Sequence, residues 1–444
     1  MRVEIEFPAT DPTGRVFLTW RPVKVSVRLL EAPVGAVSVP VRLTSNAKPG
    51  GVALSFATML THRGTDSLDL TLATDGTPVA VWIGGKFNPP NVQSPSPASI
   101  DYGDIAVQAR EIVGGAASGP LLADHKVMVR IRKNAETLTN AERDRFLLAM
   151  AALNGSGRGK FVDFRDMHNA DAVDQIHGNI SFLPWHRAYL LDFERELQVG
   201  FPEVVLPYWR FDRAAPKLFQ PSFIGISDGL RVQFSGANPL GQWTESATSR
   251  AGVKRVNGVG PQTVAPLLSE TQCMALSDGP NANFPDFAFR FDPNFGPRGL
   301  EGNPHGRAHT VHGKGGWIYD PTESQKDPLF YLLHNNIDRL WAKWQWLPSG
   351  TGGPRSDPAK PRSYHSGGAL PSGHNRTDTL WPWDGITKAQ VASRPPHAPG
   401  GGMAASLFTA LPGPTPTVAS MIDYLGAHGR EPLGFAYDDV PFEL

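Results

Sequence analysis

The histidines of this chain are unevenly placed, and their spacing is what a metal site requires. The 444 residues include 13 histidines, of which His168, His177 and His186 follow one another at intervals of nine residues. Nine residues make two and a half helical turns, so these imidazoles cannot lie on one face of one helix. They must come from the end of a helix, from a loop, and from the first turn of a helix that begins after Pro184. The apolar residues before His186 indicate a buried site.

A second group of histidines lies about 120 residues further along the chain. His305 and His309 are four residues apart, so on a helix they share one face and can converge on one ion. Such a pair on its own is more often two solvated surface histidines. His334 lies in an apolar run beside Phe330 and Trp341, which indicates a buried ring. A buried imidazole needs a hydrogen-bond partner, as in many protein cores, or a metal ion.

The ligand types restrict the metal. Neutral imidazoles without a carboxylate or thiolate suit copper, zinc or nickel, whereas magnesium and calcium prefer oxygen ligands. A catalytic three-histidine zinc site would need only one of the two groups. Two groups therefore favour a pair of redox metals, such as two copper ions that each supply one electron to O₂. The single cysteine, Cys273, excludes an intrachain disulfide, a cysteine-rich zinc site and an iron–sulfur cluster.

Composition excludes several other classes of function. The 42 Lys and Arg residues balance 42 Asp and Glu residues, which argues against binding to nucleic acid. No segment approaches the roughly 18 apolar residues of a membrane span. The alternating N-terminal residues do not resemble a secretory signal, so we expect a cytoplasmic protein, with export as a passenger on another protein left open.

The pattern of the chain predicts two domains, of which one is all-β and the other mainly α. Short alternating runs such as 3–7, 24–29 and 36–43 are separated by turn residues, which is typical of a β-sandwich. The small residues at 112–120 place the boundary there, so the predicted domains are 1–120 and 121–444. In the second domain we expect irregular segments at 212–300 and 348–400, and helices at 140–153, 161–168, 185–198 and 328–346.

Two long histidine motifs resemble those of the tyrosinase family. The run HGNISFLPWHRAYLLDFEREL at 177–197 is similar to the first copper motif of that family, and NPHGRAH at 303–309 with DPLFYLLHNNIDRLW at 327–341 is similar to the second. The segments 130–142, 206–209 and 435–437 are also similar to family landmarks. The resemblance implies a four-helix bundle that holds a binuclear, type 3 copper centre, preceded here by the β-sandwich domain.

The resemblance also implies the ligands and the reaction. His168, His177 and His186 would bind one copper ion, and His305, His309 and His334 the other. The interval from His168 to His177 is short for the family, and the nearest rival of His168 as a ligand is His125. The expected enzyme is a copper-dependent polyphenol oxidase, which oxidises small o-diphenols to o-quinones with O₂ and hydroxylates monophenols only weakly.

Further residues near the second motif bear on catalysis and substrate. Glu301 stands where the family often has a glutamate that orients a water, although it could also be an ordinary loop carboxylate. Gly306 stands where members proficient on monophenols frequently have asparagine, and this substitution favours diphenols. We expect Gly306, Thr310 and His312 to line the substrate pocket. Asp338 is expected either to orient a ligand or to pair with an arginine.

Three alternatives remain open at this level. The same residues would serve an o-aminophenol oxidase, or a haemocyanin-like O₂-binding protein without turnover. The absence of a repeated copper unit disfavours an oxygen carrier. The β-domain could cover the entrance to the copper site, or it could be a packing or assembly domain. The oligomeric state and the natural phenol are not indicated.

Overall fold

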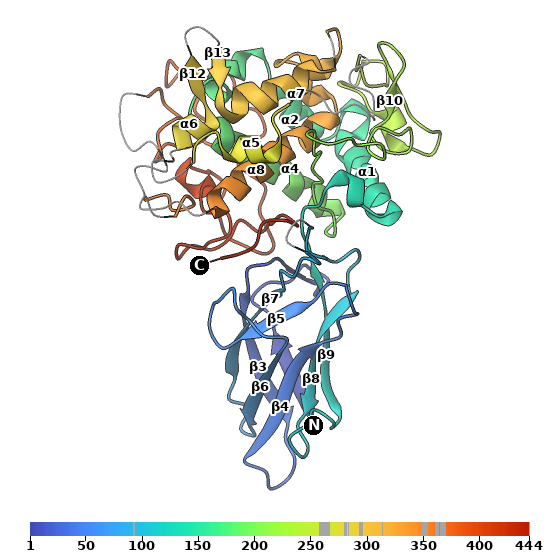
Figure 1. The fold of residues 1–444 in the computed structure, drawn as a ribbon, viewed down its shortest axis with the longest axis vertical. Helices are drawn as coiled ribbons and strands as arrows, with labels where there is room; N and C mark the ends of the chain where they lie inside the picture. Colours follow the sequence, from blue (N-terminus) through green and yellow to red (C-terminus); the bar gives the residue numbers. More distant parts are fainter. Residues whose placement is uncertain are drawn as a thin grey trace. The chain divides into compact units, whose positions relative to one another are not determined.

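The computed structural model describes residues 1–91, 94–256, 267–278, 282, 284–292, 296–312, 314–347, 354–359, 364 and 370–443 (Figure 1). Parts of the predicted irregular segments 212–300 and 348–400 lie outside these residues. The chain divides into two compact units. The β-unit comprises Met1–Arg132, Ser406–Ala410 and Leu425–Leu444, and the helical unit comprises Lys133–Ala405 and Leu411–Tyr424.

The predicted domain boundary at residue 120 is wrong. The small residues at 112–120 form a turn between two paired strands, β8 (Ile105–Glu111) and β9 (Leu121–Val129), rather than a linker. Strand β9 completes a sheet of the β-unit, and the chain leaves this unit only after Arg132. The last twenty residues, predicted to belong with the second domain, also belong to the β-unit.

Two antiparallel-rich sheets form the β-unit, with strand orders β1-β3-β7-β5 and β2-β9-β8-β4-β6. In β3, the residues Val25, Val27 and Leu29 are buried while their neighbours are more exposed, which is the alternation of a strand with one face in the core. The remaining strands are β1 (Arg2–Glu6), β2 (Val16–Leu18), β3 (Val23–Glu31), β4 (Ser38–Ser45), β5 (Leu54–Ala57), β6 (Ser67–Ala73) and β7 (Val79–Gly85).

Two of the segments that resemble the family, the start of 130–142 and 435–437, contact each other within the β-unit. Arg132 donates a hydrogen bond to the Tyr437 hydroxyl over 2.9 Å, and its guanidinium lies 3.8 Å from the ring centroid of Phe435. The indole of Trp20 donates to the Tyr437 carbonyl over 2.8 Å. Because all of these groups are buried, they fix the C-terminal segment to the β-unit.

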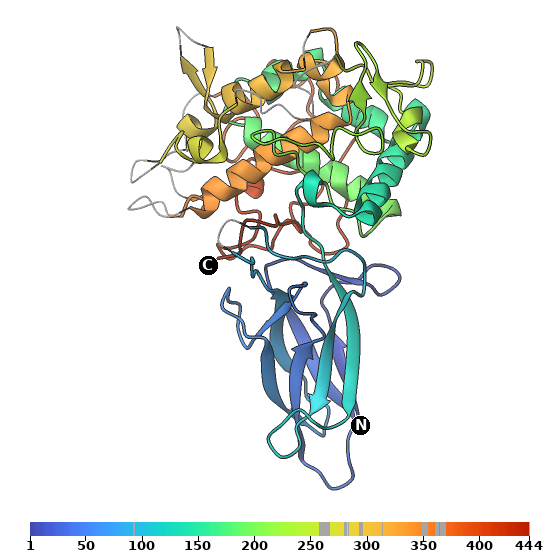
Figure 2. The same cartoon turned by 45° about the vertical axis from the view of Figure 1, so that its right-hand side comes forward.

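Four longer helices form the centre of the helical unit: α1 (Asn140–Asn154), α2 (Phe161–Met167), α4 (Phe182–Gly200) and α8 (Leu329–Trp346). All four overlap the helices predicted from the sequence. Thr139 forms the predicted capping box with Glu142 at the start of α1. Helix α8, orange in Figure 2, packs against α4, and α1 packs against both α2 and α4.

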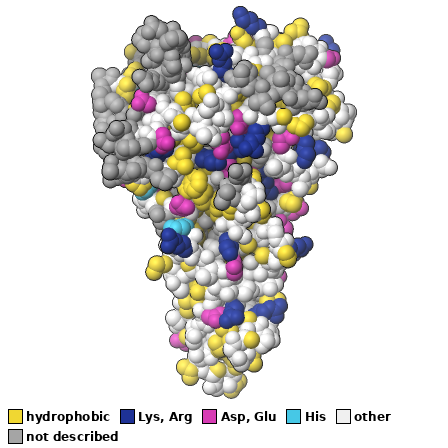
Figure 3. Space-filling view, viewed as in Figure 1, with side chains coloured by type: hydrophobic (Ala, Val, Ile, Leu, Met, Phe, Trp, Pro, Cys, Tyr) yellow, Lys and Arg dark blue, Asp and Glu magenta, His cyan; other side chains and the backbone are white. Residues whose placement is uncertain are grey.

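Shorter elements surround these helices. They are α3 (Val173–Ile176), α5 (Glu270–Met274), α6 (Phe284–Ala288), α7 (Arg307–Thr310), β10 (Ile226–Ser227), β11 (Val232–Gln233), β12 (Arg290–Asp292) and β13 (Gly296–Arg298). In the described part of the chain, no helix combines the length and the apolar character that a membrane span needs. On the face shown in Figure 3, basic and acidic side chains are intermixed.

Candidate metal centre

The first group of histidines comes together from three separate places, as the nine-residue spacing predicts. His168 follows the last residue of α2, His177 follows α3, and His186 lies in the second turn of α4. The Nε2 atom of His168 lies 3.2 Å from Nε2 of His177 and 3.3 Å from Nε2 of His186. The three ring nitrogens therefore converge on one point, and we call these residues the first triad.

The second group also converges. His305 lies in the helical turn Glu301–Gly306, His309 in α7, and His334 in the second turn of α8. Their Nε2 atoms are 3.1 Å apart for His305 and His309, 3.3 Å for His305 and His334, and 3.2 Å for His309 and His334. These residues form the second triad, and all three are buried, which is not the arrangement of solvated surface histidines.

The two triads face each other. The imidazoles of His186 and His334 stack with centroids 4.4 Å apart and an interplanar angle of 11°. His177 and His305 stack less closely, with centroids 5.7 Å apart. Two neighbouring sets of three ring nitrogens are thus available to two metal ions side by side.

The outer nitrogens of the rings fix which atom faces the metal. A carbonyl oxygen can only accept a hydrogen bond, so an Nδ1 that contacts a carbonyl must carry the proton, and Nε2 then offers its lone pair. Nδ1 contacts a carbonyl in three of the six rings: His186 with Phe182 (2.8 Å), His305 with Glu301 (2.9 Å) and His309 with Ile318 (2.7 Å).

Burial keeps five of these six imidazoles neutral. It holds the pKa of His168, His186, His305 and His334 well below the usual value for histidine. It also lowers the pKa of His309 to about 4. Because a metal binds the neutral ring, the folded protein presents its ligands in the required state at neutral pH. Imidazole nitrogens are a donor set that suits copper.

Comparison with known proteins gives the family. Residues 158–347 match the common central domain of tyrosinase. The chain is 33% identical to the tyrosinase of Streptomyces glaucescens over 289 residues, which is 60% of this chain and 97% of that protein. The chain belongs to the tyrosinase family. The tyrosinase of Streptomyces antibioticus shows the same identity and coverage. A mutant polyphenol oxidase from Thermothelomyces thermophila is 20% identical, with a TM-score of 0.41 over 66% of this chain and 86% of that one.

This tyrosinase-family chain is a copper-dependent phenol oxidase, and the family binds two copper ions. Its two triads are placed for such a binuclear site. Neither carboxylates nor the cysteine belong to the triads. Cys273 is fully buried, and burial raises the pKa of its thiol to about 12, in agreement with the inert thiol that the sequence predicts.

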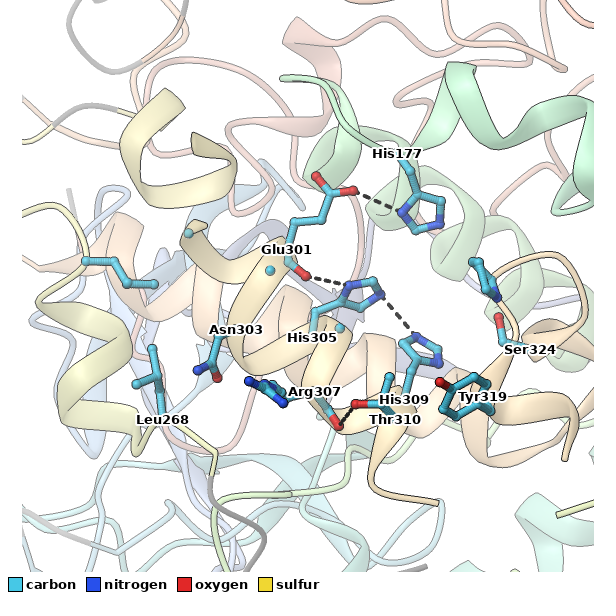
Figure 4. Close-up of a pocket in the computed structure, with 15 residues that line it drawn as sticks. His177, Leu268, Glu301, Asn303, His305, Arg307, His309, Thr310, Tyr319 and Ser324 are labelled. Atoms are coloured by element: carbon cyan, nitrogen blue, oxygen red, sulfur yellow. Dashed lines mark hydrogen bonds and ion pairs between the residues drawn. The ribbon is translucent and has the colours of Figure 1, made fainter. Parts of the chain in front are cut away.

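A cavity of about 830 Å³ leads to the triads, and Figure 4 shows the side chains that line it. Its inner wall includes His177, His305 and His309. Gly306 and Thr310 line it as predicted. The other lining residues are Leu268, Leu276, Gly299, Glu301, Gly302, Asn303, Arg307, Tyr319, Pro321 and Ser324.

Glu301 links the two triads, which is more than an ordinary loop carboxylate would do. Its Oε1 atom lies 3.1 Å from Nδ1 of His177 and accepts a hydrogen bond from the Gly178 backbone over 2.8 Å. Its own carbonyl accepts from His305. The second carboxylate oxygen, Oε2, is buried and has no hydrogen-bond partner among the described residues.

The prediction that His312 lines the pocket is wrong. Helix α7 ends at Thr310, so the chain turns away before residue 312. The His312 ring instead packs against Trp209 and Phe219, with centroids 5.6 Å and 5.8 Å away. Burial lowers its pKa to about 3. The rival ligand His125 is not part of a triad either, since it lies on β9 beside Phe7.

Asp338 pairs with an arginine, which was one of its two predicted roles. Arg187 on α4 donates to Asp338 on α8 over 2.5 Å, and both side chains are almost fully buried. Arg187 also donates to the Met421 carbonyl over 2.7 Å. The pair is therefore no surface salt bridge but a buried link between the two helices that carry His186 and His334.

One group near the first triad was not predicted. The Ser181 hydroxyl lies 2.5 Å from Nδ1 of His374, and its Oγ also lies 3.4 Å from the Gln175 carbonyl. All three side chains are buried. Ser181 and Gln175 flank His177 in sequence, so His374 ties this loop to a distant segment. His374 lies in a Gly- and Pro-rich stretch without periodicity, and no sequence signal connected it with the site.

Proposed function

We propose that this tyrosinase-family enzyme oxidises o-diphenols to o-quinones with O₂ and hydroxylates monophenols weakly or not at all. The observation that carries the proposal is the combination of the two histidine triads with a glycine, Gly306, at the wall of the cavity. We assign His168, His177 and His186 to one copper ion, and His305, His309 and His334 to the other. The helices α1, α2, α4 and α8 would then form the four-helix bundle of the family.

The copper pair, when bound, supplies the electrons that O₂ receives and takes them back from the phenol. Two catechols lose four electrons and four protons to one O₂, which gives two quinones and two waters. Burial holds five of the six ligands neutral, so that copper binding to these five needs no proton loss at neutral pH. The cavity would position the ring against His305 and His309.

Glu301 is the proposed proton acceptor. Its Oε1 is occupied by His177 and Gly178, whereas Oε2 is buried at the cavity wall with no partner among the described residues. A buried carboxylate oxygen without a partner is costly, so the site favours a water or a phenolic hydroxyl there. Glu301 would hold that group at Oε2 and accept its proton.

Gly306 explains the preference for diphenols. A β-carbon at this position would meet only the Glu301 carbonyl oxygen, at 3.4 Å, so the place is open to the cavity. No side chain projects there to polarise the group held by Glu301. A catechol can lose its protons in two favourable steps, whereas a monophenol depends more strongly on assisted deprotonation before hydroxylation.

The test measures O₂ consumption and quinone absorbance together, with the copper-loaded protein and 4-methylcatechol, 4-methylphenol or 2-aminophenol as substrate. We expect two quinones per O₂ from the catechol and little or no reaction of the phenol. The copper-free protein is the control and should be inactive. Reversible O₂ binding without turnover would support an oxygen carrier instead, and a much faster reaction of 2-aminophenol would support an aminophenol oxidase.

A further inference from the structure

The cavity is larger than a single phenol ring requires. Ligand pockets of roughly 300–1,000 Å³ hold molecules of drug size, and this cavity measures about 830 Å³. The imidazoles of the triads take up only its inner wall. Its remaining wall must therefore contact whatever the ring carries as a substituent, and the chemistry of that wall indicates the class of substrate.

We propose that Arg307 recognises an anionic group of the substrate, so that the preferred o-diphenols carry a carboxylate on a short apolar substituent. This proposal rests on the phenol oxidase function above and names the substrate class of the same site. Arg307 opens helix α7, between His305 and His309, and its side chain lines the cavity while remaining exposed.

The guanidinium of Arg307 is not neutralised by a neighbour. It forms no ion pair or side-chain hydrogen bond with any residue in the part of the chain that the structure describes. Other arginines near the site are paired: Arg187 with Asp338, and Arg255 with Asp327. An uncompensated cation at a cavity wall attracts anions, and a guanidinium can bind a carboxylate through two parallel hydrogen bonds.

A second polar group, Asn303, lines the same cavity as Arg307. In the view of Figure 4, Asn303 and Arg307 lie close together on the side of the cavity nearer Leu268 and away from Tyr319. The Oδ1 position of Asn303 is buried and has no hydrogen-bond partner among the residues that the structure describes. Since the two ends of an amide are interchangeable by rotation, the same position can present an N–H donor to a carboxylate.

The remaining wall sets the polarity and the spacing. Leu268 and Leu276 line the cavity and suit an apolar linker between the ring and the anion. The carboxylate of Glu301, at the inner wall near His177, repels a second anion. A phenol with an anionic substituent is therefore bound with its ring toward the triads and its charge toward Arg307.

The test compares 3-(3,4-dihydroxyphenyl)propanoate with its amide, since these two catechols are matched in size and only the first carries a charge. The quantity measured is the ratio of their kcat/KM values. We expect the wild type to favour the carboxylate by about three- to tenfold at low salt, and added salt to reduce this preference because the arginine is exposed. In Arg307→Gln the ratio should approach one, and in Arg307→Glu it should invert.

The matched control is Arg213→Gln, because Arg213 is another exposed arginine of the helical unit and does not line the cavity. This variant should keep the wild-type ratio. Binding of the propanoate to the copper-free protein, measured by calorimetry, should weaken in Arg307→Gln by a similar factor. A ratio that is the same in the wild type and both Arg307 variants would overturn the assignment. If the copper-loaded wild type turned over neither catechol, the proposed function would be refuted. The calorimetric comparison would still decide the role of Arg307.

Discussion

The two triads reach the same arrangement of ring nitrogens by different means. In the second triad, His305 and His309 are one helical turn apart, and His334 projects from the buried helix α8. Helical geometry sets the spacing of His305 and His309, and the nearby Ile318 carbonyl holds the His309 ring. In the first triad, His168 and His177 both lie just beyond the ends of short helices, and only His186 lies inside a long helix.

The first triad therefore depends on contacts from elsewhere in the chain. Glu301 holds the ring of His177, although the two residues are 124 positions apart. His374 holds Ser181, which is 193 positions away. The difference teaches that one half of the centre is specified by local periodicity and the other by long-range polar contacts. Changes to those contacts should weaken the first triad and leave the second intact.

Removal of a ligand from either triad should have the largest effect. His186→Ala and His309→Ala should each lower catechol turnover by more than about a hundredfold, since even partners behind the ligands are commonly worth 10- to 100-fold. Copper content, measured by atomic absorption, should fall from two ions per chain to one. His397→Ala, which changes an exposed histidine, is the control. Retention of two ions by either variant would contradict the ligand assignment.

Two substitutions of Glu301 should separate its contact with the first triad from its role as a proton acceptor. Glu301→Ala removes the hydrogen-bond acceptor of His177 and Gly178. It should lower the affinity for one of the two copper ions by about 10- to 100-fold. Glu301→Gln keeps an oxygen for these hydrogen bonds but is not a base, so copper binding should stay near the wild type while turnover falls. Competition with a chelator measures the first effect and initial rates the second.

Equal copper affinity in Glu301→Ala and the wild type would show that the first triad does not need this carboxylate. The same titration gives the affinities of both copper ions, so the more weakly bound ion can be compared with the more tightly bound one. Only the former should respond, because the contact of the second triad with Glu301 uses the backbone carbonyl, which both variants retain.

The second triad offers a complementary change. Gly306→Asn places an amide at the cavity wall where a β-carbon has room, and helix α7 should tolerate it because the backbone is already helical there. We expect the rate with 4-methylphenol to rise by several-fold, up to about tenfold. This is less than the roughly 10²- to 10⁴-fold typical of a general acid or base, because the amide only polarises the group that Glu301 holds. The ratio of phenol to catechol rates is the measurement, and Gly306→Ala is the control. No rise in this ratio would show that Gly306 does not set the preference.

The same distinction between local and long-range contacts decides what the sequence could predict. The four longer helices and the strands β1, β3 and β4 were predicted because their periodicities are local. The six histidines were found because the motifs around them are long and specific. The assignment of the C-terminal segment to the β-unit could not be predicted, since it depends on Arg132 meeting Tyr437 across 305 positions.

The errors within the site have the same origin. His312 continues the i, i+4, i+7 spacing of His305 and His309, which predicts a shared helical face, but α7 ends before it. Glu301 was identified because it lies four residues before His305. Its contact with His177 was not predicted, since the two residues are 124 positions apart. His374 was missed because its partners, Ser181 and Gln175, lie in another part of the chain.

The smallest expected effect concerns the contact between His374 and Ser181. Burial, assisted by the charge of Arg394, lowers the pKa of His374 to about 4. The unfolded ring titrates near 6.5, so between these values the unfolded chain binds more protons. The stability that the neutral ring contributes is thus complete above pH 6.5 and is lost as the pH falls toward 4. At pH 7, His374→Phe should lower the unfolding free energy of the copper-free helical unit by about 1 kcal/mol.

This loss should shrink as the pH falls, because the wild type must then protonate a buried ring that the variant lacks. Urea unfolding of the copper-free protein at pH 7.5, 6 and 5 gives the difference between the two proteins directly. His397→Phe, at an exposed position, should show a small difference that does not change with pH. Ser181→Ala should lower the copper affinity of the first triad by only a few-fold, since it removes one hydrogen bond and leaves the Glu301 contact in place. A gap between His374→Phe and the wild type that stays constant from pH 7.5 to 5 would mean that His374 does not support the first triad as a neutral buried partner of Ser181.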